Sequence, residues 1–475
     1  MTDSAHRGAL DPRTRQLLED PIVPTLLRLG APNVLIMLAQ ASVGLIETFF
    51  VGKLGTDALA GMALVFPVVM LMQTISAGAF GGAIASSIAR ALGGGRRADA
   101  DALVLHALAV AVSLSLVFTV AVLGGGRHLY SAMGGRGAAL QAAMTYSTLV
   151  FAGAALVWTF NSLSAVIRGT GNMALPAAVT CTGTVVLIPL SPLLIFGWGP
   201  VPALGIAGGA VALLAYYLLG SAALAAYLWS RNSVLRPSIA KLRFRWPLFR
   251  EILRLGLVGA ISAAATNVTI GITTALVGGF GTAAIAGYGT ASRLEYLLIP
   301  LIFGLGSPLV AIVGTCIGAG MPQRALHATW VGAALSIAMT ETIGLAAAAF
   351  PGAWLTLFNG DPAMVAAGAQ YLHAVAPFYG FFGLGLILFF ASQGAGRLLW
   401  PVLGNLGRLA VAAAGGWLAL RLGGGLPHVF MAQAVALVVY GSVNAAAIAG
   451  GAWFGPVGWP RSTVILLRRL RLDRA

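Results

Sequence analysis

Val51-Gly-Lys-Leu-Gly-Thr-Asp-Ala-Leu-Ala-Gly61 returns later in the chain as Val277-Gly-Gly-Phe-Gly-Thr-Ala-Ala-Ile-Ala-Gly287, with seven of eleven residues identical. Leu27-Arg28-Leu29-Gly30 and Leu253-Arg254-Leu255-Gly256 repeat at the same offset of 226 residues (277 − 51 and 253 − 27). An offset that stays fixed over so many residues indicates two tandem copies of one structural unit.

The sequence around both copies is strongly apolar. Hydrophobic residues make up 59% of the 475 positions and charged residues 9%, whereas soluble chains have roughly 25% charged residues. Apolar runs of about 20 residues, enough to cross a bilayer as a helix, recur along the whole chain. These runs are continuous, while the strands of a transmembrane barrel alternate apolar and polar residues. We therefore expect an all-α polytopic membrane protein.

We expect twelve transmembrane helices, at residues 24–50, 56–91, 99–123, 137–170, 172–196, 203–229, 247–277, 282–317, 323–349, 363–394, 397–421 and 427–453. Six helices per copy is an even number, so both copies lie the same way up as two parallel six-helix lobes. The predicted parts are a cytosolic N-terminal tail (1–23), an N-lobe (24–229), a basic cytosolic linker (230–246), a C-lobe (247–453) and a basic cytosolic C-terminal tail (454–475).

The basic residues predict the orientation in the membrane. With both termini cytosolic, 23 of the 28 Lys and Arg residues lie on the cytosolic side, Lys53, Arg127, Arg136 and Arg421 lie outside, and Arg293 lies inside the membrane. We expect a multi-pass protein of the cell membrane, such as a bacterial inner membrane. The net charge of +15 is spread over loops without a compact basic domain, so no nucleic-acid partner is expected.

Several motifs resemble one transporter family. Glu47-Thr-Phe-Phe-Val-Gly-Lys-Leu-Gly55, Tyr288-Gly-Thr-Ala-Ser-Arg-Leu-Glu295 and Gly314-Thr-Cys-Ile-Gly-Ala-Gly320 look like the multidrug and toxic compound extrusion (MATE) family. The resemblance implies twelve helices in two lobes and export of organic cations or other toxic compounds, driven by inward flow of H⁺ or Na⁺. The family usually carries Asp at Glu47 and often Asn and Asp at Leu187 and Ser191. These departures weaken a Na⁺ site in the N-lobe and favour proton coupling.

Three carboxylates, Glu47, Glu295 and Glu341, lie deep in the predicted spans. A charge at the bilayer centre costs about 2.5 to 3.5 kcal/mol or more, so we take these residues as candidates for binding the coupling ion. Asn33, Gln40 and Glu47 recur every seven residues and share one helix face. For Glu47 the alternative is an interfacial carboxylate that reaches outward to water. For Glu341 the alternative is a structural or interfacial position.

Glu295 is the strongest candidate because it lies midway along its helix, on one face with Ser292 and Tyr288. A carboxylate removed from water favours its protonated form, so it can bind a proton that a cation later displaces. The alternative is an ion pair with Arg293, but residues two apart do not face each other on a helix. We expect Arg293 to pair across helices with Glu47 or Glu341, or to contact an anionic substrate group.

Further polar and aromatic candidates for a substrate cavity are Gln40, Gln73, Asn161, Tyr288, Arg293, Tyr296, Tyr379 and Gln393. Ordinary hydrogen bonding between helices is the alternative for each. One Arg against three Glu within the spans predicts a cationic, amphipathic small-molecule substrate.

Other function classes lack their motifs. The chain has no P-loop and no H-E-x-x-H zinc motif, and its His and Cys residues form no metal-ligand pattern. We therefore expect a monomeric transporter that is not an enzyme and has no cofactor or metal. It would be a secondary antiporter working by alternating access. A flippase for lipids or lipid-linked sugars, with a related architecture, is the alternative. A major facilitator would need an Arg/Asp-rich loop after its second helix, which Gly93-Gly-Gly-Arg-Arg97 lacks.

Overall fold

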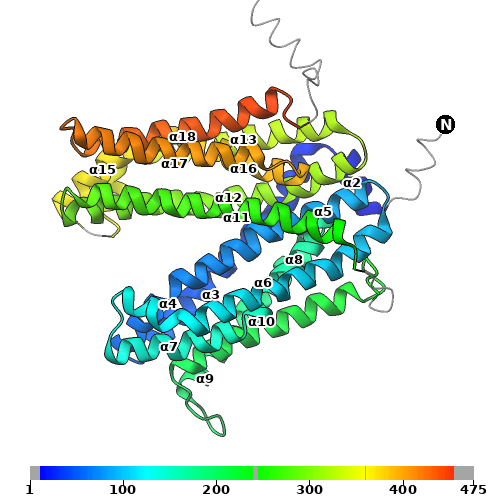
Figure 1. Ribbon diagram of the computed structural model, residues 1–475, viewed down its shortest axis with the longest axis horizontal. Coiled ribbons are helices and arrows are strands. Elements are labelled where there is room, and N and C mark those ends of the chain that lie inside the picture. The colour runs from blue at the N-terminus through cyan, green and yellow to red at the C-terminus, as the bar shows by residue number, and fades with distance from the viewer. Residues whose placement is uncertain (1–10, 239–243, 359, 454–475) are drawn as a thin grey trace, which may run out of the picture. The chain divides into compact units, whose positions relative to one another are not determined.

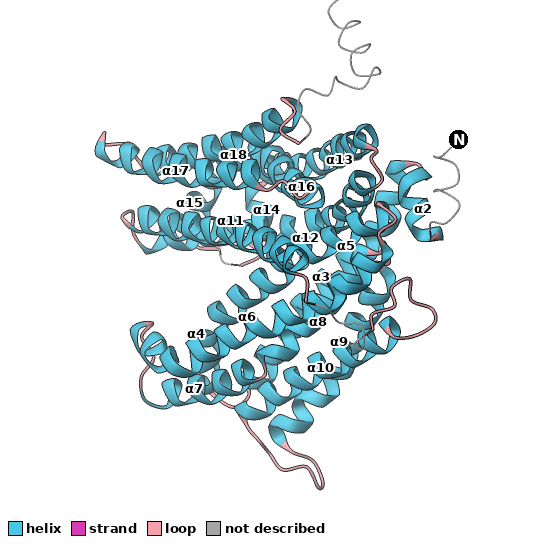
Figure 2. Ribbon diagram, turned by 45° about the vertical axis from the view of Figure 1, so that its right-hand side comes forward, coloured by secondary structure: helices cyan, strands magenta, loops and turns pink. Residues whose placement is uncertain are grey.

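A computed structural model describes residues 11–238, 244–358 and 360–453. These residues form helices and one isolated β-bridge, between Trp198 and Val201 (Figures 1 and 2). The first repeat contains α2 (Pro12–Glu19), α3 (Ile22–Gly52), α4 (Thr56–Gln73), the π-helix η1 (Thr74–Phe80), α5 (Gly81–Gly93), α6 (Arg97–Ala132), α7 (Gly137–Ala152), α8 (Ala154–Gly169), α9 (Ala174–Phe196) and α10 (Ile206–Leu228). The second contains α11 (Trp246–Gly278), α12 (Thr282–Gly318), α13 (Pro322–Ala349), α14 (Pro351–Leu355), α15 (Pro362–Val375), the 3₁₀ helix η3 (Ala376–Phe378), α16 (Tyr379–Ala395), α17 (Leu399–Arg421) and α18 (Leu426–Ala449).

The described helices supply the predicted membrane spans. Eleven helical stretches are long and apolar enough to cross a bilayer, and α7 with α8, bent by 48°, makes the twelfth. The all-α polytopic class with twelve spans is therefore confirmed. The bend lies at Gly153, where an added Cβ would be 2.3 Å from a Leu214 methyl carbon, so a larger residue would require the Leu214 side chain to move. The largest end difference is in the third span, predicted to end at residue 123, whereas α6 continues to Ala132.

The described chain forms two compact units. One contains the residues up to Leu17 and Arg28–Ala260, and the other contains Leu18–Leu27 and the residues from Ile261 onward. The chain thus changes unit inside α2, inside α3 and inside α11, and not in a loop. The predicted boundaries of tails, lobes and linker stay predictions. Residues 1–10, 239–243 and 454–475, which belong to the predicted tails and linker, lie outside the described residues.

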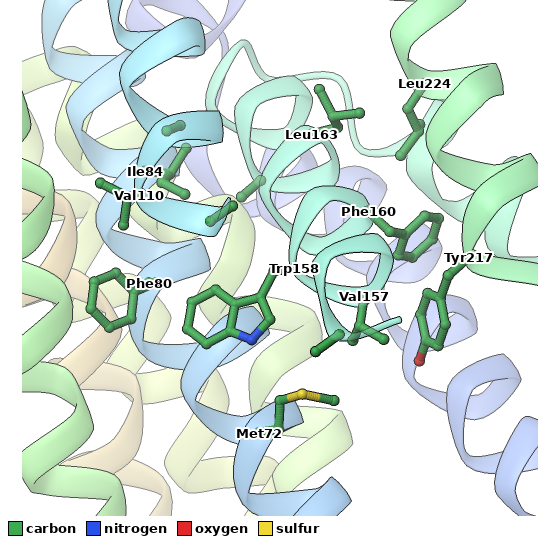
Figure 3. Packing of buried hydrophobic residues seen from close by; sticks show 14 of the residues in the cluster. Met72, Phe80, Ile84, Val110, Val157, Trp158, Phe160, Leu163, Tyr217 and Leu224 are labelled. Atoms are coloured by element: carbon green, nitrogen blue, oxygen red, sulfur yellow. The ribbon is translucent and has the colours of Figure 1, made fainter. Parts of the chain in front are cut away.

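The core of the first unit is built around α8. Trp158 and Phe160 are each 1% exposed. The Trp158 ring lies 5.7 Å from that of Phe80 (Figure 3), and Phe160 lies 5.5 Å from Tyr217 on α10. In lipid, where apolar surface gains little from leaving the solvent, such close packing holds helices together.

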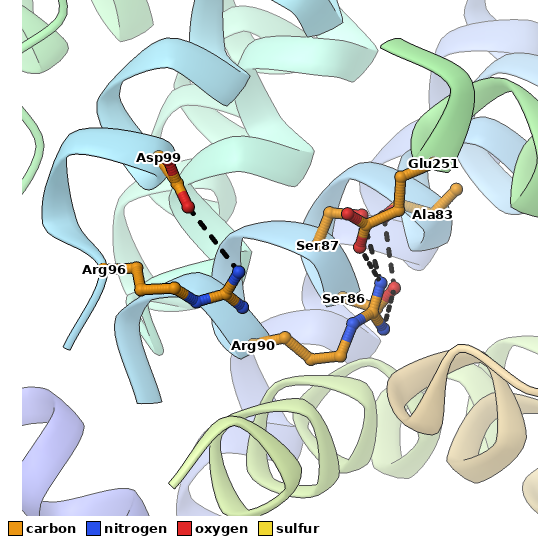
Figure 4. A network of polar contacts seen from close by, with 7 residues as sticks. All are labelled: Ala83, Ser86, Ser87, Arg90, Arg96, Asp99 and Glu251. Atoms are coloured by element: carbon orange, nitrogen blue, oxygen red, sulfur yellow. Dashed lines mark hydrogen bonds and ion pairs between the residues drawn. The ribbon is translucent and has the colours of Figure 1, made fainter. Parts of the chain in front are cut away.

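Polar side chains fasten the start of α11 to α5 within the first unit. Arg90 Nη2 lies 2.6 Å from Glu251 Oε1, and Ser87 donates to the same carboxylate oxygen at 3.1 Å (Figure 4). Ser86 accepts from Arg90 Nη1 at 3.0 Å. Arg90 therefore connects three polar groups with one guanidinium, whose fork of N–H donors suits such a network.

Glycines permit close helix packing in the second unit. An added Cβ on Gly344 of α13 would lie 2.1 Å from the Ala376 carbonyl oxygen, and one on Gly383 of α16 would lie 2.3 Å from Thr340 Oγ1. Ser336 donates its hydroxyl to the Gly383 carbonyl at 3.0 Å. Small residues at such positions let two helix backbones approach and hydrogen-bond across the contact.

Candidate functional site

Glu295 lies on α12 at a small cavity inside the second unit. The cavity is lined by Thr269, Ile270, Thr273, Tyr288, Glu295, Tyr371, Val375, Arg408, Gln433 and Leu437. It has room for about one water molecule, which is enough for a proton or a small ion but not for a drug-sized ligand. In this conformation the cavity is therefore too small for a drug-sized substrate.

Two side chains hold the Glu295 carboxylate, one at each oxygen. Tyr371 on α15 donates its hydroxyl to Oε2 at 3.1 Å, and Arg408 on α17 donates Nη2 to Oε1 at 3.4 Å. The side chains of Arg408 and Glu295 are 6% and 16% exposed, so this ion pair is largely shielded from solvent. Removing either partner would leave a buried charge uncompensated, which is far more costly than losing a surface ion pair.

The Arg408 guanidinium is also held by aromatic rings. Its Cζ lies 5.3 Å from the centre of the Phe382 ring and 5.9 Å from that of Tyr440. An aromatic face attracts a cation at this distance, and more strongly where water is excluded. Arg408 Nε is buried and has no hydrogen-bond partner. Glu295 and the two rings therefore provide the observed electrostatic stabilisation of this cation.

The opposite side of the cavity is neutral and polar. Gln433 on α18 donates to Thr273 Oγ1 on α11 at 2.5 Å, and Thr273 in turn donates to the Thr269 carbonyl at 2.8 Å. The Tyr288 ring closes the wall, 5.3 Å from the Tyr371 ring. The cavity thus offers hydroxyl and amide groups but no second carboxylate.

The first unit holds its own buried carboxylate, Glu47 on α3, which is 3% exposed. Tyr146 on α7 donates its hydroxyl to Glu47 Oε2 at 2.8 Å, while Oε1 has no hydrogen-bond partner. Among the residues that the structure describes, no basic side chain forms an ion pair with Glu47. Glu47 is therefore a buried carboxyl group held by one hydrogen bond.

Gln73 and Asn161, two of the predicted cavity residues, lie together in the first unit. Asn161 Nδ2 donates to Gln73 Oε1 at 3.0 Å and to Ser76 Oγ at 2.8 Å. Gln73 also donates to the Tyr217 hydroxyl, and Tyr217 lies within electrostatic range of Glu47. The network surrounds the start of η1, where a π-helix often marks a functional position.

The two tyrosines that bind these carboxylates are equivalent in the repeat. Tyr146 and Tyr371 differ by 225 residues, the offset that also relates Gly169 to Gly394. The carboxylates that they bind are not equivalent. Glu47 lies on the first membrane-spanning helix of its repeat, α3, and Glu295 lies on the second one of its repeat, α12. The residue that corresponds to Glu47 in the second repeat, 226 positions later, is Thr273. Thr273 lines the Glu295 cavity.

Glu341 does not line the cavity. Its Oε2 accepts the backbone N–H of Gly380 at 2.7 Å, in the first turn of α16. This helix begins after the break at η3, so its first N–H groups have no partners within the helix. Glu341 therefore caps a helix N-terminus, where a carboxylate is favourable.

Arg293 differs from the prediction that it pairs with Glu47 or Glu341. Its side chain is exposed, and its Cζ lies 5.5 Å from the Phe358 ring. Among the described residues Arg293 forms no ion pair with Glu47, which accepts from Tyr146, or with Glu341, which accepts from Gly380. The alternative, a contact with an anionic substrate group, stays a prediction. Tyr296, 47% exposed, also lies outside the cavity lining.

Three other predicted cavity residues do not line the cavity: Gln40, Tyr379 and Gln393. Gln40 is half-buried on α3, and Gln393 is fully buried near the end of α16. Tyr379 is fully buried at the start of α16, within electrostatic range of Glu295. Of the predicted substrate residues, only Tyr288 lines the cavity.

The predicted charge balance within the spans leaves out two buried arginines. Arg293 was expected to be the one basic residue there, but Arg408 lies inside α17 at 5% exposure, and Arg168 lies in the last turn of α8 at 6%. The Arg168 guanidinium donates to Ser164 Oγ at 2.8 Å. With these two cations included, the formal surplus of two negative charges disappears, and with it the electrostatic argument for a cationic substrate.

Sequence reasoning missed Arg408, Tyr371 and Gln433. Arg408 lies in the interior of the predicted span 397–421. Placing a charged side chain at that depth costs free energy, which in itself indicates a functional residue. The repeat could have drawn attention to Tyr371 as the counterpart of Tyr146. Gln433 had no comparable signal, because its role depends on which helix faces α11.

The chain has twelve spans in two repeats and buried carboxylates in polar surroundings. These features are typical of the class of polytopic membrane transporters. The MatE family model matches residues 32–193 and 260–418. A probable multidrug resistance protein NorM from Deinococcus radiodurans is 31% identical over 80% of this chain and 84% of its own length. An FAD transporter from Shewanella oneidensis is 28% identical over 83% of this chain and 87% of its own.

Solved structures show the same fold. A crystal structure titled as MATE in the bent conformation superposes with a TM-score of 0.85 at 21% identity, covering 92% of this chain and 96% of that one. A MOP superfamily transporter from Pyrococcus furiosus gives 0.80 at 22% identity, with coverage of 92% and 96%. The chain belongs to the MATE family of membrane transporters, and it is a transporter, not an enzyme.

Proposed function

We propose that this protein is a secondary active antiporter that exports small toxic molecules in exchange for H⁺, with Glu295 as the main coupling residue and Glu47 contributing. The observation that carries the proposal is the placement of Glu295 in a polar, water-sized cavity within the transmembrane helices. There the carboxylate can exchange a proton while Tyr371 and Arg408 hold its position. A change of charge at this depth biases a transporter between its two access states.

Multidrug export is the first substrate proposal, supported by the NorM relative. A flavin nucleotide is the second, because the relative from Shewanella oneidensis is an FAD transporter and because Arg408 and Arg168 offset the buried carboxylates. The lipid flippase alternative has no support among the relatives described above. We further propose a monomer in the cell membrane with both termini cytosolic, which fits the distribution of basic residues.

Proteoliposomes loaded with ethidium, a fluorescent organic cation, test the proposal, with FAD as a parallel probe. An imposed proton gradient should drive export by the wild type and not by Glu295→Gln. Glu341→Gln is the matched control, because it removes another carboxylate within the spans but keeps an oxygen to accept the Gly380 N–H. Equal gradient-driven export by Glu295→Gln and wild type would remove Glu295 from the mechanism.

A further inference from the structure

We infer that Arg408 is a resident counter-ion of Glu295 and makes the site selective for a proton over a sodium ion. The inference rests on the proposed function, because it assigns the ion specificity of the same carboxylate. Its starting observation is the ion pair itself, in which Arg408 Nη2 lies 3.4 Å from Glu295 Oε1 inside the second unit. Arg408 is thus a specificity-determining residue that acts through Glu295.

The charge of the site argues against a metal cation. Glu295 is the only carboxylate lining the cavity, and Arg408 already balances its charge. Within the described residues no group of three or more His, Cys, Asp and Glu side chains could hold a metal ion. A sodium ion would have to enter beside a fixed positive charge in a region of low dielectric constant, where like charges repel strongly.

The guanidinium is poorly placed to move aside. Its side chain is 6% exposed, and the rings of Phe382 and Tyr440 lie 5.3 and 5.9 Å from its Cζ. A metal ion needs several ligand oxygens around it, and Arg408 Nη2 already occupies one side of Oε1. A proton needs no such shell, because it bonds directly to one carboxylate oxygen and leaves a neutral acid.

The other titratable groups near Glu295 do not change the charge balance between Glu295 and Arg408. Those within electrostatic range are Arg408, Tyr288, Tyr296, Tyr371 and Tyr379, which lie on α12, α15, α16 and α17. Four of the five are tyrosines, which are neutral near physiological pH. The cavity residues from α11 and α18 do not titrate. Arg408 is therefore the group whose charge decides which ion Glu295 accepts.

The experiment compares wild type, Arg408→Lys, Arg408→Gln and the double variant Glu295→Gln/Arg408→Gln in proteoliposomes. Ethidium export is measured against pH under a proton gradient, and against a sodium gradient at equal pH on both sides. Wild type should respond only to protons. Arg408→Gln removes the positive neighbour that favours the carboxylate form, so the midpoint of its export-against-pH profile should move to higher pH than that of wild type. Export driven by sodium should rise at least severalfold in this variant.

Arg408→Lys keeps the positive charge, so whatever its rate of export, this variant should still respond to protons and not to a sodium gradient. If Arg408→Gln fails to fold because Glu295 is left unpaired, the double variant removes both charges and shows whether the protein tolerates the loss. In that case the inference is tested by the export of wild type and Arg408→Lys under a sodium gradient. Export by wild type under a sodium gradient alone, or an Arg408→Gln protein with the wild-type pH profile and no sodium response, overturns the inference.

The two proposals fail in different ways. If Glu295→Gln abolishes proton-driven export while Arg408→Gln changes neither readout, Glu295 keeps its coupling role and Arg408 loses the one assigned here. If Glu295→Gln transports like the wild type, the proposed function itself fails.

Discussion

Tyr146 and Tyr371 occupy equivalent positions of the two repeats, and each donates its hydroxyl to a buried carboxylate, at 2.8 Å to Glu47 and at 3.1 Å to Glu295. The donor is the same in both repeats, while the acceptor lies on a different helix in each copy. Only Glu295 also has a basic partner, Arg408, among the described residues. The two equivalent tyrosines thus bind chemically different sites, a carboxyl without a counter-ion and one with a counter-ion.

Replacing Tyr371 with Phe removes one hydrogen bond to the Glu295 carboxylate and leaves the ring packing against Phe430 in place. A hydrogen bond to a charged group contributes roughly 1.5–3 kcal/mol, so its loss favours the protonated carboxyl. The midpoint of proton-driven export should therefore move to higher pH than in the wild type. The pH profile of ethidium export in proteoliposomes measures this shift.

Tyr130→Phe is the control for that prediction, because Tyr130 is a buried tyrosine of the first unit that does not line the Glu295 cavity. Its pH profile should remain close to wild type. A Tyr371→Phe profile that also matches wild type would mean that this hydrogen bond does not influence proton binding.

Replacing Asn161 with Leu removes the donor shared by Gln73 and Ser76. Buried polar groups left without a partner cost about 1–3 kcal/mol, so thermal unfolding in detergent should occur at a lower temperature. Asn267→Ala is the control, since that exposed side chain bonds only to its own helix, at the Ala263 carbonyl. Equal unfolding temperatures for the two variants would show that the network adds little stability.

Replacing Gly383 with Ala places a methyl group 2.3 Å from Thr340 Oγ1, closer than nonbonded atoms allow. Thr340 also donates to the Ser336 carbonyl, so it cannot turn away without breaking that bond. Overpacking of this kind costs about 1–3 kcal/mol. Gly271→Ala, where an added Cβ meets no atom within 4 Å, should unfold at or above the wild-type temperature. Differential scanning measurements on both proteins check this, and an unchanged Gly383→Ala would contradict the packing described here.

Much of the fold could be predicted because membrane helices leave a strong local signal. Long apolar runs and the 226-residue repeat fixed the number of spans, and helix α12 begins at the predicted residue and ends one residue beyond the predicted end. The bend after Gly153 was not predicted, because glycine is frequent in this chain and only the approach of Leu214 distinguishes this one.

The site could be predicted only in part. The cost of charge in lipid pointed to Glu295 and Glu47, and helical periodicity placed Tyr288 on the same face as Glu295. Their partners lie on other helices, and periodicity within one helix does not tell which helices meet. Arg293 was therefore preferred as the intramembrane cation, although Arg408 is the residue that contacts Glu295.

Proton release on substrate binding tests the central claim most directly. Purified protein in weakly buffered detergent solution is mixed with ethidium at a series of pH values while a pH-sensitive dye is followed. The account predicts release of up to about one proton from this carboxyl per wild-type molecule, by linkage between the two ligands, and little or none from Glu295→Gln. The same release from both proteins, with ethidium bound equally well, would contradict it.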